Sequence, residues 1–312
     1  MDAILDILLT PEFGYSVIRV TTPILFAALG AVIANTAGIA NIALEGIMLI
    51  AAFVGVIVSA FVGNAWVGLI AAVLAGMIFA GVLAFFTLYY KTNVILGGIA
   101  LNMFASGGTV FFLYLFTGDK GTSASLASKT LPQINIPIIK DIPILGQIIS
   151  GHNILTYVAM VAVVVIFIMF KKTAFGYRLK AVGENPNAAD SVGINVIKTK
   201  ATALVLSGAL AGLGGAFMSM GYVSWFARDM VAGRGWIAIA AEAMGKSSTI
   251  GTAVTSLLFG AADATSNSLG VLGIPSELLR ILPYVATILG LIGYAIAEDR
   301  KKKKKFLKGA SK

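Results

Sequence analysis

Long uncharged apolar runs dominate the chain and predict membrane-spanning helices. The runs cover residues 20–44, 46–90, 92–118, 153–170, 201–227 and 281–297. A helix needs about 20 apolar residues to cross about 30 Å of hydrocarbon, so the run 46–90 is long enough for two helices. A turn at Gly63–Asn64 would separate those two helices. The pattern predicts an all-α integral membrane fold, a polytopic helix bundle of about 8 to 10 spans.

The stretch between residues 235 and 273 breaks this pattern. The apolar run 236–244 is too short to cross a bilayer, and the run 249–269 is long enough but contains Asp263. A short segment beside a glycine-rich break is typical of a re-entrant or discontinuous helix. Such backbone is tolerated at membrane depth only inside protein or beside a cavity.

Composition supports the membrane assignment. Of the 312 residues, 58% are hydrophobic and 12% are charged, whereas soluble domains average about 25% charged residues. There is no cysteine, and His152 is the single histidine. These counts exclude disulfides, thiol catalysis, a cysteine- or histidine-rich metal site and any two-histidine relay. The first charges in the chain are acidic, whereas a signal peptide begins with positive charge. We expect one membrane domain over residues 1–312.

The cations are clustered and predict the orientation. The chain has 23 Lys and Arg against 14 Asp and Glu, and 14 of these cations lie in two segments, residues 171–200 and 300–312. The positive-inside rule places both segments in the cytoplasm of a cell membrane. Residues 118–152 would then lie outside, and residues 298–312 form a basic cytoplasmic tail. The tail suits anionic membrane lipid rather than nucleic acid.

Polar residues inside the apolar runs are candidates for a substrate path, because an ionised side chain at the bilayer centre costs at least ~2.5 kcal/mol. Glu45 could lie in a discontinuous helix that lines the path, or in a loop where it caps the next helix. Asp263 could line a cavity or bond between helices, and the same choice holds for Asn102. The candidates are Asn41, Glu45, Asn102, Asp263 and Asn267. Glu242 and Arg280 are further ionisable groups, and we expect Arg280 to form a surface pair with Glu277.

The sequence contains no motif for catalysis. Gly245-Lys246-Ser247 resembles the end of a phosphate-binding loop, but Ala240 stands where that motif needs glycine. No histidine-based zinc motif and no G-x-S-x-G elbow is present. We therefore predict no catalytic residue and no metal site, and any ATP that drives this protein would be hydrolysed by another chain.

The most informative stretch is residues 175–194. Asn185–Pro186 is a helix-start signal, with asparagine as the cap and proline at the first helical position. Gly193 would end the short helix. A short capped helix between two spans, flanked by cations, suits a partner surface, and a plain interfacial helix is the alternative.

This stretch resembles the coupling-helix loop of ABC importer permease subunits in the ribose, branched-chain amino acid and nucleoside permease family. The shared pattern is G-x-x-x-x-A-x-G-x-N-x-x-A-A-x-x-x-G-I, carried by Gly176, Ala181, Gly183, Asn185, Ala188, Ala189, Gly193 and Ile194. Residues 41–49 also resemble the family's N-terminal signature, especially in its nucleoside and simple-sugar branch.

The resemblance implies a transmembrane permease domain over residues 1–312 with residues 171–200 as a cytoplasmic coupling loop. An ATP-binding cassette subunit would hold ATP and magnesium, with no cofactor on this chain. A second, different and longer permease chain would complete the pore, and an extracytoplasmic binding lipoprotein would deliver the substrate. The residues that would couple to the ATPase are Gly183, Glu184, Asn185, Pro186, Ala188, Ala189 and Gly193.

The resemblance favours nucleosides as substrates, with ribose-like sugars as the alternative. Both are neutral and rich in hydroxyl groups, which suits a path lined by Asn, Ser, Thr and Glu. An ion-coupled secondary transporter that uses Glu45, Glu242 or Asp263 as ion sites is a further alternative.

Overall fold

The computed structural model describes residues 10–137 and 142–270, together with seven positions between 285 and 296. Helices build this part of the chain, and its extended pairings are isolated bridges at Thr122–Ala227 and Gln133–Asn153. The all-α membrane fold is confirmed. The Glu277–Arg280 pair, most of the predicted last span and the basic tail lie outside the described residues.

Six helices among the described residues are long and apolar enough to cross a membrane. The predicted turn is present, because Gly63 has a left-handed φ of 73° and Asn64 caps the next helix through the amides of Trp66 and Val67. The first span starts earlier than predicted, at Pro11, so it includes Arg19. The six are α2 (Pro11–Thr36), α3 (Leu44–Val62), α4 (Ala65–Leu88), α5 (Val94–Thr117), α7 (Ile154–Lys172) and α10 (Val196–Phe217), which continues as the π-helical turn η1 (Met218–Tyr222).

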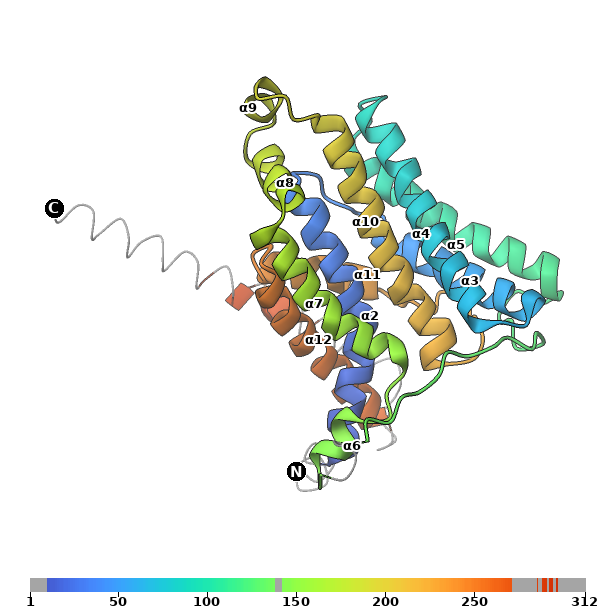
Figure 1. The fold of residues 1–312 in the computed structure, drawn as a ribbon. Coiled ribbons are helices and arrows are strands. Elements are labelled where there is room, and N and C mark those ends of the chain that lie inside the picture. The colour runs from blue at the N-terminus through green and yellow to red at the C-terminus, as the bar shows by residue number, and fades with distance from the viewer. Residues whose placement is uncertain are drawn as a thin grey trace.

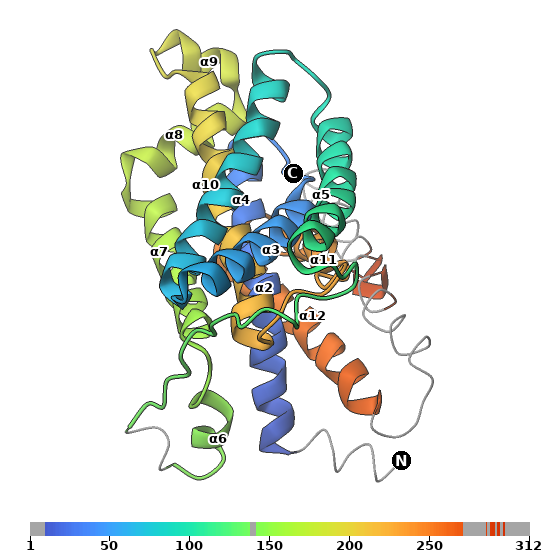
Figure 2. The same ribbon diagram turned by 90° about the vertical axis from the view of Figure 1, so that its right-hand side faces the viewer.

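Helix α2 forms the centre of the bundle (Figures 1 and 2), with 83% of its most apolar window buried. It packs against α10 and against α12 (Thr249–Leu269). Glycines allow the closest approaches: a Cβ on Gly76 of α4 would collide with the carbonyl oxygen of Gly208 on α10. The short helices α9 (Pro186–Ser191) and α6 (Leu145–Ile149) mark opposite ends of the bundle, called here the α9 end and the α6 end.

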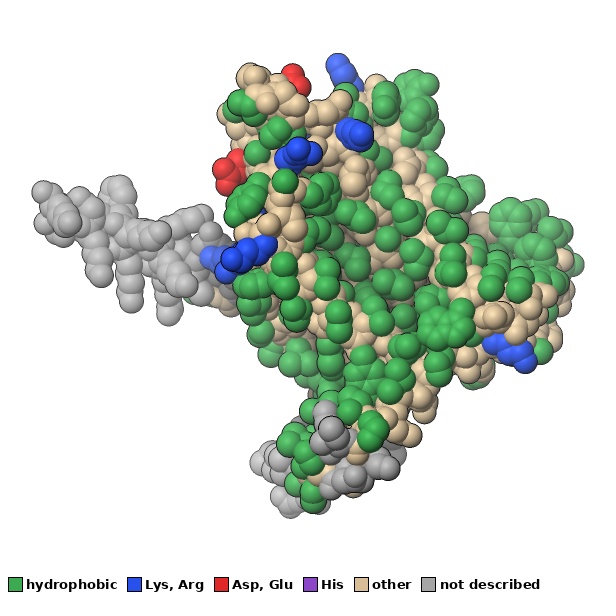
Figure 3. All heavy atoms as spheres, in the orientation of Figure 1, with side chains coloured by type: hydrophobic (Ala, Val, Ile, Leu, Met, Phe, Trp, Pro, Cys, Tyr) green, Lys and Arg blue, Asp and Glu red, His purple; other side chains and the backbone are tan. Residues whose placement is uncertain are grey.

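The periphery of the bundle is apolar. Figure 3 shows hydrophobic side chains over much of the visible surface. In α4, α5 and α7 only 28%, 17% and 28% of the most apolar window is buried. Exposed apolar surface of this extent suits contact with lipid tails or with another membrane chain.

Two segments interrupt the helical packing inside the bundle. The first is the α2–α3 connection, residues 37–43, and the second is residues 223–233, which lead into α11 (Arg234–Met244). The apolar run 236–244 thus lies in a helix of 11 residues, as its length predicts. Asn35 in the last turn of α2 bonds to Glu242 in the last turn of α11, so both helices end at the α9 end. At 1.5 Å per residue, the 11 residues of α11 form a helix about 16 Å long.

Candidate coupling surface and polar core

The segment after α7 folds into two helices, α8 (Ala174–Glu184) and α9. The Asn185 side chain accepts a hydrogen bond of 3.0 Å from the Ala188 amide, and Pro186 occupies the first turn of α9. Gly193 follows α9 with a φ of +82°, a conformation that glycine adopts without strain. The predicted short, capped helix is therefore present, with Asn185 and Pro186 at its start and Gly193 after its end.

Most of α9 faces away from the bundle. Val192 is 75% exposed, and Ala189 is 3% exposed and anchors the helix. An exposed apolar side chain beside an exposed helix face offers a contact surface to another protein. Of the predicted coupling residues, the exposed ones are Glu184, Asn185, Pro186, Ala188 and Gly193.

Gly183 has a different position from the other predicted coupling residues. A Cβ at this position would collide with the carbonyl oxygen of Thr36 and approach the backbone of Gly38. Gly183 therefore lies where α8 touches the end of α2 and the start of the α2–α3 connection. It joins the α8–α9 segment to the centre of the bundle and does not lie on the outward face.

The α2–α3 connection is held by asparagine side chains. Asn102 of α5 accepts from the Gly46 amide at 2.8 Å and donates to the Ile42 carbonyl oxygen at 2.9 Å. Asn41 donates to the Ser207 hydroxyl oxygen of α10 at 3.0 Å and accepts from the Ala43 amide. Backbone polar groups away from water need such partners. The side chains of both asparagines thus form hydrogen bonds with other groups of the protein in this structure. This geometry fits the interpretation that Asn102 bonds between helices.

Glu45 links the two interrupted segments. Its carboxylate accepts from the Gly233 and Gly235 amides, both at 2.7 Å. These amides belong to the N-cap residue and the first turn of α11, where a helix has unpaired N–H groups and a positive dipole end. Glu45 is the second residue of α3 and caps the start of α11, whereas the sequence reading placed it in a loop that caps the helix following it.

Asp263 forms an ion pair between helices. Its Oδ2 accepts from Nη2 of Arg234 at 2.8 Å, and the two side chains are 11% and 14% exposed. Asn267, one helical turn along α12, is exposed in this chain. The two residues do not share one environment, although both were predicted as path residues.

Sequence reasoning missed three partners of the buried carboxylates in this polar core. Arg234 was not considered as the counter-ion of Asp263, although it stands between two glycines next to the short helix. Asn35 and Ser247 were also not considered; both donate to Oε1 of Glu242, at 2.8 and 2.5 Å. An acidic residue in an apolar run needs a hydrogen-bond donor, and this is the signal that could have led to all three.

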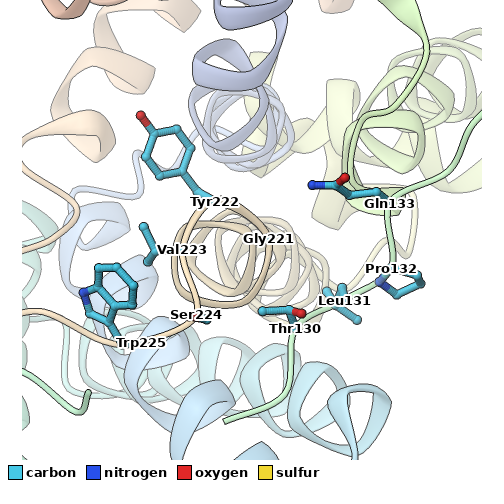
Figure 4. A pocket seen from close by; sticks show the side chains of 9 residues that line it. All are labelled: Thr130, Leu131, Pro132, Gln133, Gly221, Tyr222, Val223, Ser224 and Trp225. Carbon is cyan, nitrogen blue, oxygen red and sulfur yellow. The ribbon is translucent and has the colours of Figure 1, made fainter. Parts of the chain in front are cut away.

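A hollow of about 620 Å³ opens at the α6 end (Figure 4). The strand-like segment with Leu131 runs along the end of η1, where the Leu131 amide donates to the Met220 carbonyl oxygen. Residues 223–225 line this hollow, residues 226–228 then pair with residues 121–123 after α5, and the Gly233 amide reaches Glu45. The lining residues are Thr130, Leu131, Pro132, Gln133, Gly221, Tyr222, Val223, Ser224 and Trp225.

Comparison with known proteins gives consistent matches over nearly the whole chain. Residues 15–291 match the family model described as branched-chain amino acid transport system / permease component. The guanosine ABC transporter permease protein NupQ of Bacillus subtilis is 35% identical, covering 90% of this chain and 91% of its own. The nucleoside ABC transporter permease protein NupC of Lactococcus lactis is 34% identical, covering 89% and 91%. The putative glucose ABC transporter permease protein TsgC13 of Haloferax volcanii is 32% identical, covering 79% and 74%.

Proposed function

The chain belongs to the family of branched-chain amino acid transport system permease components and is a membrane permease subunit of an ABC transporter, and we propose that it imports nucleosides. It is not itself an enzyme; the ATPase of such a system is a separate subunit. The two relatives that match about nine-tenths of this chain carry guanosine and nucleoside in their names. That agreement carries the substrate proposal.

The exposed face of α9 is the proposed docking site for the ATP-binding cassette subunit, which would hold ATP and magnesium. The face is outward, and Gly183 ties its base to the end of α2. A movement of α9 would therefore reach the α2–α3 connection, and from there the contacts of Asn102 and Glu45 would carry it to α5 and α11. This chain of contacts supports residues 171–200 as the coupling loop, with Gly183 as a transmission point.

The remaining partners follow from the surface and the family. Helix α5 has 17% of its apolar window buried, so a second permease chain, different and longer, would cover part of it. An extracytoplasmic binding lipoprotein would meet the α6 end, where the hollow opens. The α9 end and the basic tail would lie in the cytoplasm, the tail next to anionic lipid and away from nucleic acid.

Sugar import is the second candidate, because TsgC13 carries glucose in its name. The ion-coupled alternative has less support. Glu45, Glu242 and Asp263 each bond to protein donors in this structure, and the exposed α9 face would have no role in a secondary transporter.

The experiment that tests the proposal is uptake of labelled guanosine and uridine in cells with and without the gene. Ribose and leucine serve as unlabelled competitors. We expect the deletion to abolish ATP-dependent nucleoside uptake. In cells that have the gene, unlabelled ribose and leucine should not reduce the uptake of labelled nucleosides. Uptake competed by ribose would favour the sugar alternative, and unchanged nucleoside uptake in cells without another nucleoside system would contradict the proposal.

The docking role is tested by Ala188→Glu, because Ala188 is exposed on α9. A buried charge at the interface with the ATPase should abolish uptake while the purified permease keeps its melting temperature. Ala188→Ser, which keeps a small uncharged side chain at the same exposed position, is the matched control and should transport normally. Unaltered uptake by the Ala188→Glu variant would overturn the docking site.

A further inference from the structure

The segment 223–233 reaches the middle of a membrane-spanning helix. Its Asp229 accepts a hydrogen bond of 2.9 Å through Oδ1 from the hydroxyl of Ser106. Ser106 is the thirteenth of the 24 residues of α5, so Asp229 lies half-way along a span. At 1.5 Å per residue this is about 18 Å from either end of that helix.

Two charged side chains are exposed at this depth. Arg228 Nε lies 3.4 Å from Oδ2 of Asp229, and their side chains are 63% and 55% exposed. An ionised group facing hydrocarbon would cost at least ~2.5 kcal/mol. Non-helical backbone at membrane depth also requires protein or a water-filled cavity beside it. This face of the chain therefore does not face lipid tails.

The backbone here is held in an unusual shape. Asp229 and Ala232 have positive φ values of 52° and 51°, which cost energy for residues other than glycine. Glu45 fixes the end of the segment through the Gly233 and Gly235 amides. The charged pair is thus presented by a braced segment, attached to α3 at one point and to α5 at another.

Apolar and aromatic groups accompany the pair. Trp236 in the first turn of α11 is 44% exposed, and Met103 on α5, one helical turn before Ser106, is 72% exposed. Figure 2 views the molecule from the side on which α5 lies. The side therefore combines a planar aromatic ring, a guanidinium donor, a carboxylate acceptor and a hydroxyl.

We propose that this side, formed by Ser106, Arg228, Asp229 and Trp236, is this chain's part of the translocation path and contacts the nucleoside as it passes. The inference rests on the proposed function. A nucleoside has a flat base that stacks on an indole ring, and base edges and ribose hydroxyls that exchange hydrogen bonds with an Arg–Asp pair. The hollow at the α6 end, where the segment begins, is the entrance to this path.

This chain has no native cysteine, so single-cysteine labelling in the assembled transporter, read on this chain after the subunits are separated, is a direct test. Met103→Cys and Ser106→Cys should react with a charged, membrane-impermeant thiosulfonate, because such reagents modify thiols only in water. Guanosine should slow the reaction at both positions, and ribose should not. Ile78→Cys on α4 and Val161→Cys on α7, exposed apolar positions near mid-helix, are the lipid-facing controls and should stay unlabelled.

Transport kinetics give the second readout. Arg228→Ala should raise the KM for guanosine at least about tenfold, as loss of one charged hydrogen bond does, with protein level and melting temperature unchanged. If cysteine variants that still transport nucleosides remain unlabelled at 103 and 106, this side is covered by the second permease chain and the inference is wrong. Wild-type complex without nucleoside uptake would instead contradict the proposed function.

Discussion

At the residue scale, Glu45 connects parts of the chain that are distant in sequence. Its two carboxylate oxygens each accept a hydrogen bond from one amide at the start of α11, and these amides belong to Gly233 and Gly235, which follow Glu45 by 188 and 190 positions. Charge-assisted bonds of this kind contribute about 1.5–3 kcal/mol. We expect Glu45→Ala to lower the melting temperature of the purified permease and Glu45→Gln to lower it less, since glutamine keeps one acceptor oxygen.

The matched control for this prediction is Glu184→Ala, which removes an exposed carboxylate and should leave stability within about 0.5 kcal/mol of wild type. The comparison also separates two roles. If Glu45→Ala melted like wild type yet lost uptake, Glu45 would act on the substrate and not as a helix cap.

His152 predicts a pH dependence. Its ring is 1% exposed and stacks on Tyr15 with centroids 4.0 Å apart, while Nε2 donates to the Ile148 carbonyl oxygen and Nδ1 has no hydrogen-bond partner. Burial, followed by the charge of Arg19, lowers the pKa of His152 below its usual 6.5. The folded state thus favours the neutral ring, whereas the unfolded chain takes up the proton near its ordinary pKa.

Stability from this group is therefore complete above about pH 6.5 and falls as the pH drops below that value. We expect the melting temperature to decrease between pH 7.5 and 5.5, and His152→Gln to flatten this decrease. Because His152 is the single histidine, an equal slope in the variant would show that carboxylates cause the effect.

At the scale of elements, the joint between α8 and α2 depends on a glycine for space. The Cβ of an alanine at Gly183 would collide with the Thr36 carbonyl oxygen, whereas Gly193 has no atom within 4 Å of such a Cβ but has a φ of +82°. Gly183→Ala should therefore cost more than Gly193→Ala, which carries about 1 kcal/mol of backbone strain. Thermal unfolding of the two variants without the ATPase would measure this; a smaller loss at Gly183 would contradict the joint.

Helices were the most predictable elements, because an uncharged apolar run of sufficient length can cross a membrane in few conformations other than a helix. The turn at Gly63–Asn64 and the Asn185–Pro186 cap were predictable from local chemistry. The start of α2 was not, because Arg19 interrupts its apolar run, and its guanidinium lies 4.6 Å from the centroid of the Tyr222 ring. A contact between residues 203 positions apart leaves no local signal.

The candidate site shows the same limit. The sequence marked Glu45 and Asp263 as costly residues, since burial of a carboxylate requires a partner wherever the chain places it. It did not identify the amides of Gly233 and Gly235 or the guanidinium of Arg234 as those partners. Nor did it mark Arg228 and Asp229, because only the bond to Ser106 shows their depth in the bundle.

At the scale of the whole molecule, charge determines which end of the bundle faces the cytoplasm. Residues 171–200 carry six cations against three in residues 118–152, and the difference favours a cytoplasmic α9 end. Ser191 and Ser125 are exposed near opposite ends, so Ser191→Cys and Ser125→Cys form a matched pair. In intact cells an impermeant maleimide should label only the Ser125 variant, and permeabilised cells should label both. The reverse pattern would place α9 outside, where no ATP-binding subunit could reach it, and the importer would need another coupling surface.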